Sequence, residues 1–132
     1  MRLITPLSIK SIKTQDELET IMKTNKPVLC LFSASWCAPC QKLHPIIEEI
    51  RLQTKTLAAG NVDKEKLLED IAWVTVDVDQ SEDLCAHYNI QSIPHLHLFI
   101  NGKRHSDIVG PTKEQVVDLV MASCGSELVM TP

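Results

Sequence analysis

Apolar residues recur along the chain in four short runs of strand length, over residues 7–12, 28–33, 72–78 and 95–100. The run 28–33 has no polar alternation, which indicates a strand covered on both faces, as at the centre of a parallel sheet. Asn101-Gly102 follows the last run and is a strong signal for a two-residue hairpin, which leads into a fifth strand over 103–109. The pattern therefore predicts five strands, of which the last two are antiparallel.

The segments between these runs carry helical spacing. Thr14-Gln15-Asp16-Glu17 matches a capping box, with Thr14 as N-cap, and predicts a helix that ends near Asn25. Thr112 is a second predicted N-cap, for a last helix that ends at Ala122. The other helices are expected over residues 42–57, with a kink at Pro45, and over 81–88, while the charged stretch 62–70 carries a weak helical signal.

The resulting order of elements is β-α-β-α-β-α-β-β-α, which is typical of a single α/β domain. Helices between strands require parallel pairings, and the hairpin adds an antiparallel pair, so a mixed central sheet is expected. The predicted boundaries are an N-terminal segment over 1–13, the domain over 14–124 and a flexible tail over 125–132.

Composition and charge exclude several classes of function. The chain has 132 residues and a net charge of −4, without a basic stripe of interleaved aromatics, so nucleic-acid binding is not expected. No apolar run approaches the ~20 residues needed to cross a bilayer, so no membrane partner is expected either. Five cysteines, an odd and sparse set, favour a reducing compartment and hence the cytoplasm. Residues 1–13 hold three basic residues and no acid, which keeps the mitochondrial matrix as an alternative.

Cys37-Ala38-Pro39-Cys40 is the segment with the clearest chemistry. It lies where a predicted strand ends and a predicted helix begins. Unpaired N–H groups and the helix dipole favour negative charge at a helix N-terminus, so the pKa of Cys37 should be lowered and its thiolate should be a nucleophile. A CxxC pair alone is weak evidence, because zinc and haem sites also use it.

Together with other motifs, the pair resembles the thioredoxin family over residues 27–122. The resemblance implies a three-layer α/β sandwich with a mixed, mostly parallel sheet and helices on both faces. The matching features are the segment Phe32-Ser33-Ala34-Ser35-Trp36-Cys37-Ala38-Pro39-Cys40, Pro45 in the following helix, Val76-Asp77-Val78-Asp79, the Ile93-Pro94 pair that is cis in the family, and Gly110.

The resemblance implies a protein-disulfide reductase. An exposed Cys37 would attack the substrate disulfide, and a more buried Cys40 would resolve the mixed disulfide. No bound cofactor or metal is implied beyond the redox-active disulfide, and NADPH acts only indirectly, through a separate thioredoxin reductase. Disulfide-containing clients of the peroxiredoxin, ribonucleotide reductase or methionine sulfoxide reductase type are implied. The residues expected to contact substrate are Trp36, Ala38, Pro39, Ile93, Pro94 and Gly110.

Three departures from the family pattern bear on the rate. Leu31 stands where the family keeps a buried aspartate that relays the proton of the second cysteine, so activity is expected to be lowered. Thr75 replaces a lysine that neighbours that aspartate, and Ala38 replaces a glycine. Residues 57–69 are expected to be an insertion that makes a surface excursion or a partner contact.

Two alternative functions remain open from the sequence. One is a thioredoxin-like partner-binding protein with weak or specialised redox activity. The other, less favoured, is an Fe–S or metal carrier in which the histidines His44, His95 and His97 join the cysteine pair. Hydrogen-bonded structural histidines are the preferred interpretation, with His95 a candidate for tuning the pKa of Cys37. Of the other cysteines, Cys30 is expected in the core, Cys85 partly exposed, and Cys124 near a frayed end as a candidate for intermolecular disulfides.

Overall fold

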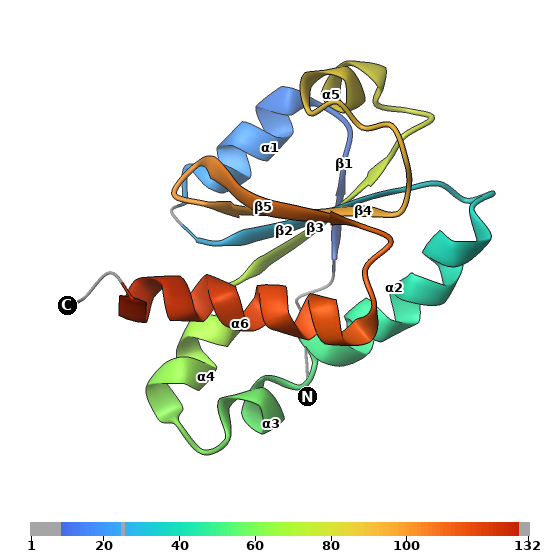
Figure 1. The fold of residues 1–132 in the computed structure, drawn as a ribbon. Coiled ribbons are helices and arrows are strands. Elements are labelled where there is room, and N and C mark those ends of the chain that lie inside the picture. Colours follow the sequence, from blue (N-terminus) through green and yellow to red (C-terminus); the bar gives the residue numbers. More distant parts are fainter. Residues whose placement is uncertain (1–8, 25, 130–132) are drawn as a thin grey trace, which may run out of the picture.

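A five-stranded sheet forms the centre of the molecule (Figure 1). The structure is a computed structural model that describes residues 9–24 and 26–129, with 125–129 described by their backbone alone. The strand order is β1-β3-β2-β4-β5. Of these strands, β4 alone runs opposite to the others, so the mixed sheet is confirmed. The bounds are β1 Lys10–Ile12, β2 Val28–Ser33, β3 Ala72–Asp77, β4 His95–Ile100 and β5 Lys103–Val109. The predicted start of the first strand at residues 7 and 8 lies outside the described residues.

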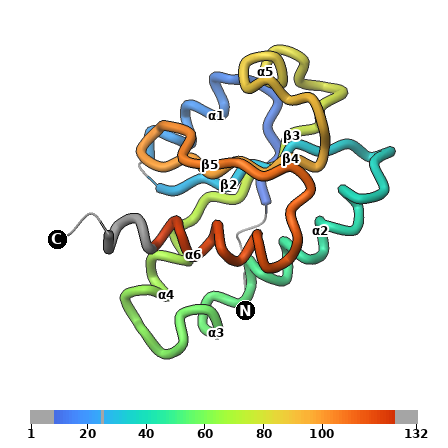
Figure 2. The backbone as a smooth tube through the Cα atoms, in the orientation of Figure 1, coloured from blue at the N-terminus to red at the C-terminus, as the bar shows by residue number. Residues whose placement is uncertain are grey.

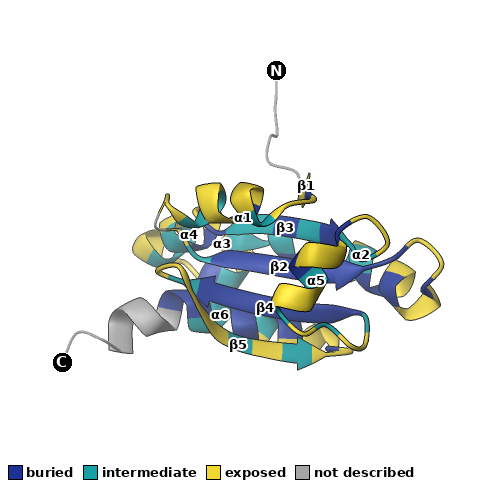
Figure 3. Ribbon diagram, turned by 90° about the horizontal axis from the view of Figure 1, so that it is seen from above, coloured by how far each residue is buried: buried dark blue, intermediate teal, exposed yellow. Residues whose placement is uncertain are grey.

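Helices cover both faces of the sheet, as the view in Figure 3 also shows. Two of them, α1 (Gln15–Met22) and α5 (Glu82–His87), lie on one face. The other face carries α2 (Ala38–Arg51), α3 (Thr54–Ala58), α4 (Val62–Glu69) and α6 (Lys113–Val129). Both side chains of the capping box before α1 make their hydrogen bonds, which confirms Thr14 as its N-cap.

Strand β2 is buried along its whole length, as its sequence predicts. Because successive side chains of a strand point to opposite faces, it contributes to two apolar clusters. Leu29 and Leu31 belong to the cluster beneath α2 and α6, which we call the α2/α6 face. Cys30 and Phe32 point to the other side, the α1/α5 face. The residues at the end of β2 are thereby fixed between two packed layers.

The β4–β5 hairpin turns at Asn101 and Gly102, both with positive φ (55° and 78°), as the sequence predicts. The pairing register of the two strands shifts by one residue between Leu98 and Phe99. Phe99 pairs with Arg104, but Leu98 pairs with Ser106, so a β-bulge leaves His105 without a partner on β4.

The predicted helix 42–57 is wrong at both ends. The helix α2 begins at Ala38 and ends at Arg51, and α3 is a separate short helix. The buried stripe of α2 ends at Ile50, and Leu52 is 64% exposed, so one continuous helix does not carry the apolar stripe on to Leu57. Pro45 lies inside α2, and the helix continues through it.

Residues 57–69 lie mostly at the surface, as expected, but two of them reach the core. Ala58 and Leu68, from α3 and α4, are buried in the apolar cluster of the α2/α6 face. Figure 2 shows α4 beside α6 and α3 next to α4, both away from the β2–α2 turn.

The last helix continues beyond the predicted end at Ala122. Thr112 and Gln115 exchange capping hydrogen bonds at its start, which confirms the predicted N-cap. The buried positions Val116, Val120 and Cys124 continue the helical spacing past Ala122, so the helix keeps a core to pack against. Its backbone is helical to Val129, within the predicted tail 125–132, whose last three residues lie outside the described part.

Candidate functional site

Cys37 and Cys40 form a disulfide at the start of α2, where the sequence predicts a strand-to-helix turn. Their Cα atoms lie 5.2 Å apart. Cys37 is the N-cap of α2, and its Sγ accepts a hydrogen bond of 3.3 Å from the backbone N–H of Cys40. Negative charge on the Cys37 sulfur is therefore stabilised by a helix N-terminus.

The two sulfurs are less accessible than expected. Cys37 is 5% exposed and Cys40 is fully buried, so the prediction of an exposed Cys37 is wrong in this disulfide form. Ala34 packs with both cysteines, and Val78 and Ile93 contact this cluster. Cys37 is thus covered by residues of the loops that follow β3 and α5.

The side chains around the pair are exposed and apolar. Trp36 is 68% exposed, and its indole N–H donates a 2.8 Å hydrogen bond to the Asp79 carboxylate. Ala38 and Pro39, between the cysteines, are exposed as well. Asp79, two residues beyond the end of β3, therefore orients the aromatic ring beside the disulfide.

Ile93 and Pro94 border the disulfide on its other side. Their peptide bond is cis, as the family resemblance implies, and the Ile93 carbonyl lies 4.0 Å from the Cys37 sulfur. The Gly110 N–H donates a 2.8 Å hydrogen bond to the Pro94 carbonyl. Gly110 has φ +59°, a conformation that favours glycine. The structure thus brings Ile93, Pro94 and Gly110 together at the cysteine pair.

Leu31 lies on the α2/α6 face, 3% exposed and surrounded by apolar side chains. Thr75, on the neighbouring strand, donates its hydroxyl to the Leu31 carbonyl at 3.3 Å. On the same face Ser33 Oγ lies 3.2 Å from His44 Nε2, one helical turn after Cys40. Of the departures on this face, Leu31 is apolar, and Thr75 carries a hydroxyl bonded to the backbone, so neither residue supplies a carboxylate or an amine beneath Cys40.

The histidines expected to join the cysteines lie on two different faces of the sheet. Leu31 pairs with Leu96, whereas Phe32 pairs with His95, so His95 and His97 point to the α1/α5 face and His44 to the other. The alternative metal site built from the cysteines and all three histidines is therefore not assembled.

Asp107 is a neighbour of these histidines that the sequence reasoning missed. Its Oδ2 lies 2.7 Å from His95 Nε2, and this hydrogen bond holds the pKa of Asp107 below its ordinary value. His97 is fully buried among the rings of Phe32 and Tyr88, and burial lowers its pKa to about 4. An Asn-Gly hairpin signal places the two strands together, but the bulge decides which residue of β5 faces His97.

Of the remaining cysteines, Cys30 and Cys85 lie as the sequence predicts, whereas Cys124 is more buried. Cys30 lies in the core, as predicted, where burial raises the pKa of its thiol far above its ordinary value. Cys124 is 1% exposed, so its predicted place near a frayed end is wrong. Cys85 is half-buried and lines a cavity of about 320 Å³ together with Trp36 and Ile93.

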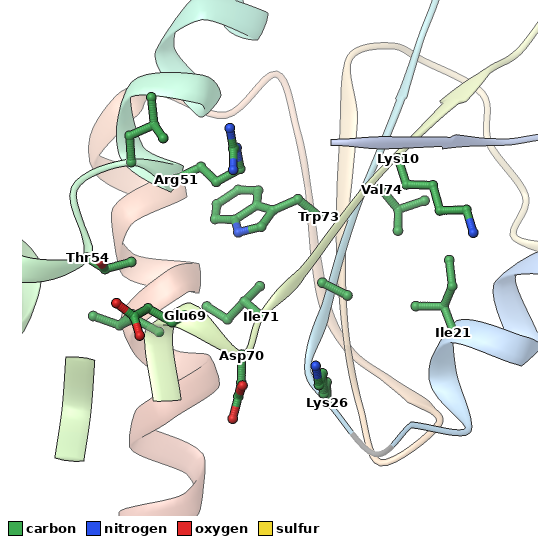
Figure 4. Close-up of a pocket in the computed structure, with 13 residues that line it drawn as sticks. Lys10, Ile21, Lys26, Arg51, Thr54, Glu69, Asp70, Ile71, Trp73 and Val74 are labelled. Atoms are coloured by element: carbon green, nitrogen blue, oxygen red, sulfur yellow. The ribbon is translucent and has the colours of Figure 1, made fainter. Parts of the chain in front are cut away.

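A second cavity, of about 490 Å³, lies at the start of β3 (Figure 4). Trp73, Lys26 and Arg51 line it. Because Ala72 pairs with Val28 at the start of β2, and Asp77 pairs with Ser33 at its end, this cavity and the disulfide lie at opposite ends of the sheet. Over residues 9–24 and 26–129, none of the helices has the length and apolar character needed to cross a membrane.

Comparison with known proteins identifies the family. The family model for thioredoxin matches residues 9–122. The thioredoxin of Mycoplasmoides gallisepticum is 35% identical over 102 residues, which cover 77% of this chain and 88% of that relative. The thioredoxin of Rickettsia bellii is 38% identical over 92 residues, covering 70% and 75%.

Solved structures agree with the sequence relatives. A mutant thioredoxin from Halobacterium salinarum superposes with a TM-score of 0.68 at 30% identity, over 87% of this chain and 89% of that one. The thioredoxin of Schistosoma mansoni gives a TM-score of 0.68 at 29% identity, over 86% and 94%. The chain therefore belongs to the thioredoxin family, and its Cys37–Cys40 pair is the dithiol–disulfide exchange centre of a thiol–disulfide oxidoreductase.

Proposed function

We propose that the protein reduces disulfides of client proteins, with Cys37 as the nucleophile and Cys40 as the resolving thiol. The observation that carries this assignment is the hydrogen bond from the Cys40 N–H to the Cys37 sulfur at the start of α2. The Cys37 thiolate attacks one client sulfur, forms a mixed disulfide and releases the other client thiolate. Cys40 then loses its proton and attacks Cys37, which releases the second client thiolate. Two electrons pass to the client, and the Cys37–Cys40 disulfide results.

The client is expected to bind across the apolar surface around the disulfide. Trp36, Ala38 and Pro39 provide exposed contacts on one side. On the other side, the Ile93 backbone beside Cys37 is placed to pair with an extended client segment as a strand would. Pro94 and Gly110 support that backbone through their hydrogen bond.

The oxidised pair requires a source of electrons. By family, this source is a thioredoxin reductase that takes its electrons from NADPH, so NADPH acts on this chain only indirectly. Clients of the peroxiredoxin, ribonucleotide reductase or methionine sulfoxide reductase type fit the same chemistry. The cytoplasm is the proposed compartment, with the mitochondrial matrix as the alternative.

Mixed-disulfide trapping tests the assignment of roles. Cys40→Ser leaves the nucleophile without its resolving partner, so clients should remain attached to Cys37 and be released by dithiothreitol. The matched control is the Cys37→Ser/Cys40→Ser double variant, which should capture nothing. The parent protein should reduce insulin when coupled to a thioredoxin reductase and NADPH. Absence of both capture and insulin reduction would show that the proposed function is wrong.

A second candidate function is binding of a specific partner with slow turnover, and Leu31 favours it. Without a carboxylate at this buried position, the deprotonation of Cys40 has no base of the family type. This function predicts capture by Cys40→Ser together with insulin reduction at background rate in the parent.

Leu31→Asp should speed insulin reduction near neutral pH. A carboxyl buried among apolar side chains has a raised pKa, which suits a group that accepts a proton from Cys40. Leu31→Asn is the matched control, since it has the same shape without a titratable group. Rates measured from about pH 6 to about pH 8 check the prediction, and an aspartate variant no faster than the asparagine variant contradicts it.

A further inference from the structure

We propose that His95, His97 and Asp107 form a binding site for a divalent transition-metal ion, with Zn²⁺ as the ion expected from this ligand set. Each residue offers one ligand atom, and the three atoms lie within 4.8 Å of one another. The site is separate from the cysteine pair, which supplies no ligand to it.

The first argument is the state of the imidazole nitrogens. Among the described residues, neither ring nitrogen of His97 has a hydrogen-bond partner, and both are buried. The Nδ1 atom of His95 is likewise buried without a partner in this part of the chain. Buried polar atoms of this kind cost folding free energy unless something binds them, and each requires an explanation. A metal ion accepts such a nitrogen lone pair directly.

The second argument is the carboxylate beside the histidines. Asp107 Oδ2 lies 2.7 Å from His95 Nε2, so a carboxylate oxygen is already next to the imidazole rings. Imidazole nitrogen and carboxylate oxygen are both ligand types that zinc binds in proteins.

The third argument is geometry. Two imidazoles and one carboxylate, with a fourth position left to solvent, are a common zinc ligand set. Bonds of about 2.1 Å place tetrahedral ligands roughly 3.4 Å apart. The ligand atoms lie within 4.8 Å of one another, and His95 Nε2 and Asp107 Oδ2 are 2.7 Å apart, so a metal ion would open this pair slightly and draw the more distant atoms together. The Asp107 side chain, 35% exposed on the edge strand β5, has room for this movement. Solvent reaches the site from the same side, which leaves an entry path and a fourth ligand position.

The β4–β5 pairing holds the ligands in place. Asp107 lies directly opposite His97, and His95 is the next residue of β4 on the same face. The His97 ring is fixed by Phe32, Tyr88 and Phe99 at centroid distances of 5.2, 5.8 and 5.9 Å. Two buried imidazoles and one exposed carboxylate therefore share one face of the sheet.

Titration of the full-length, oxidised protein with Co²⁺ tests the proposal. In the disulfide form the Cys37 and Cys40 thiolates are absent, so binding at the proposed site should give visible d–d absorption without a thiolate charge-transfer band. Zn²⁺ should displace the Co²⁺. His97→Leu and Asp107→Asn should each weaken Co²⁺ binding at least about tenfold.

His105→Asn is the matched control, since His105 is exposed on the same strand and lies outside the ligand set. It should bind Co²⁺ as the parent does. Because Asp107 is exposed, its asparagine variant tests the site even where His97→Leu alters packing. No absorption in the parent, or absorption that persists unchanged in Asp107→Asn, would overturn the proposal. Insulin reduction is not a readout here, so this result is independent of the proposed redox function.

Discussion

Cys37→Ser should abolish insulin reduction, whereas Cys40→Ser should abolish turnover but keep a reactive thiol. The reason is the position of the first sulfur at the N-cap of α2, where the Cys40 N–H and the helix dipole stabilise a thiolate. Cys40 lies inside the helix and is fully buried, so its own thiolate lacks this stabilisation. A serine hydroxyl at position 37 is not ionised at neutral pH and cannot take part in disulfide exchange.

Two measurements check this division of roles. Insulin reduction should fall to background in both variants. Alkylation of the reduced protein by iodoacetamide should stay rapid near neutral pH in Cys40→Ser and be lost in Cys37→Ser. Cys124→Ala, which removes a buried thiol far from the pair, is the control and should keep the parent's rate. Rapid alkylation of Cys40 in the Cys37→Ser variant would contradict the assignment of the nucleophile.

Acid should destabilise the metal-free protein through His97, and His97→Leu should remove this sensitivity. The folded pKa of His97 is about 4, because of burial first and of His95 and Arg104 next, while Asp107 acts in the opposite direction. The unfolded chain binds a proton near pH 6.5, as an ordinary histidine does. Between these values the unfolded state carries more protons, so the free energy of unfolding falls as the pH falls. The loss from this one group is about 3 kcal/mol between neutral pH and pH 4.

Denaturation by urea in the presence of EDTA, from about pH 7.5 to about pH 4, measures this effect. In His97→Leu, the part of the acid-induced decrease in the free energy of unfolding that is due to His97 should disappear. The free energy of unfolding at neutral pH should rise, since two unpartnered buried nitrogens are removed. His105→Leu is the control and should lose stability in acid as the parent does. An identical pH dependence in His97→Leu and the parent would refute the prediction.

Local sequence signals predicted the elements that position the cysteine pair. The apolar run before Cys37 and the capping box at Thr14 depend on residues close in the chain, and both appear in the structure as expected. The end of α2 was misplaced, because Leu57 has helical spacing but Leu52, five residues earlier, turns to solvent. That change depends on where the sheet ends, which spacing alone does not show.

The cluster of His95, His97 and Asp107 could not be predicted from the sequence, for a different reason. An ideal two-residue hairpin at Asn101-Gly102 places Ser106 opposite His97 and turns Asp107 to the other face. The bulge at His105 shifts the register by one residue and sets Asp107 opposite His97 instead. A bulge has no reliable sequence signal, so the carboxylate beside the histidines became visible only with the backbone.

Because of the same bulge, the two ends of the hairpin should differ in how well they tolerate insertions and deletions. Because the extra residue is absorbed between Leu98 and Phe99, a residue gained or lost near the turn need not move the far end of β5. That end holds the Gly110–Pro94 hydrogen bond next to the disulfide. Homologues of this chain are therefore expected to vary in length at residues 101–105 while keeping a constant spacing from Asp107 to Gly110.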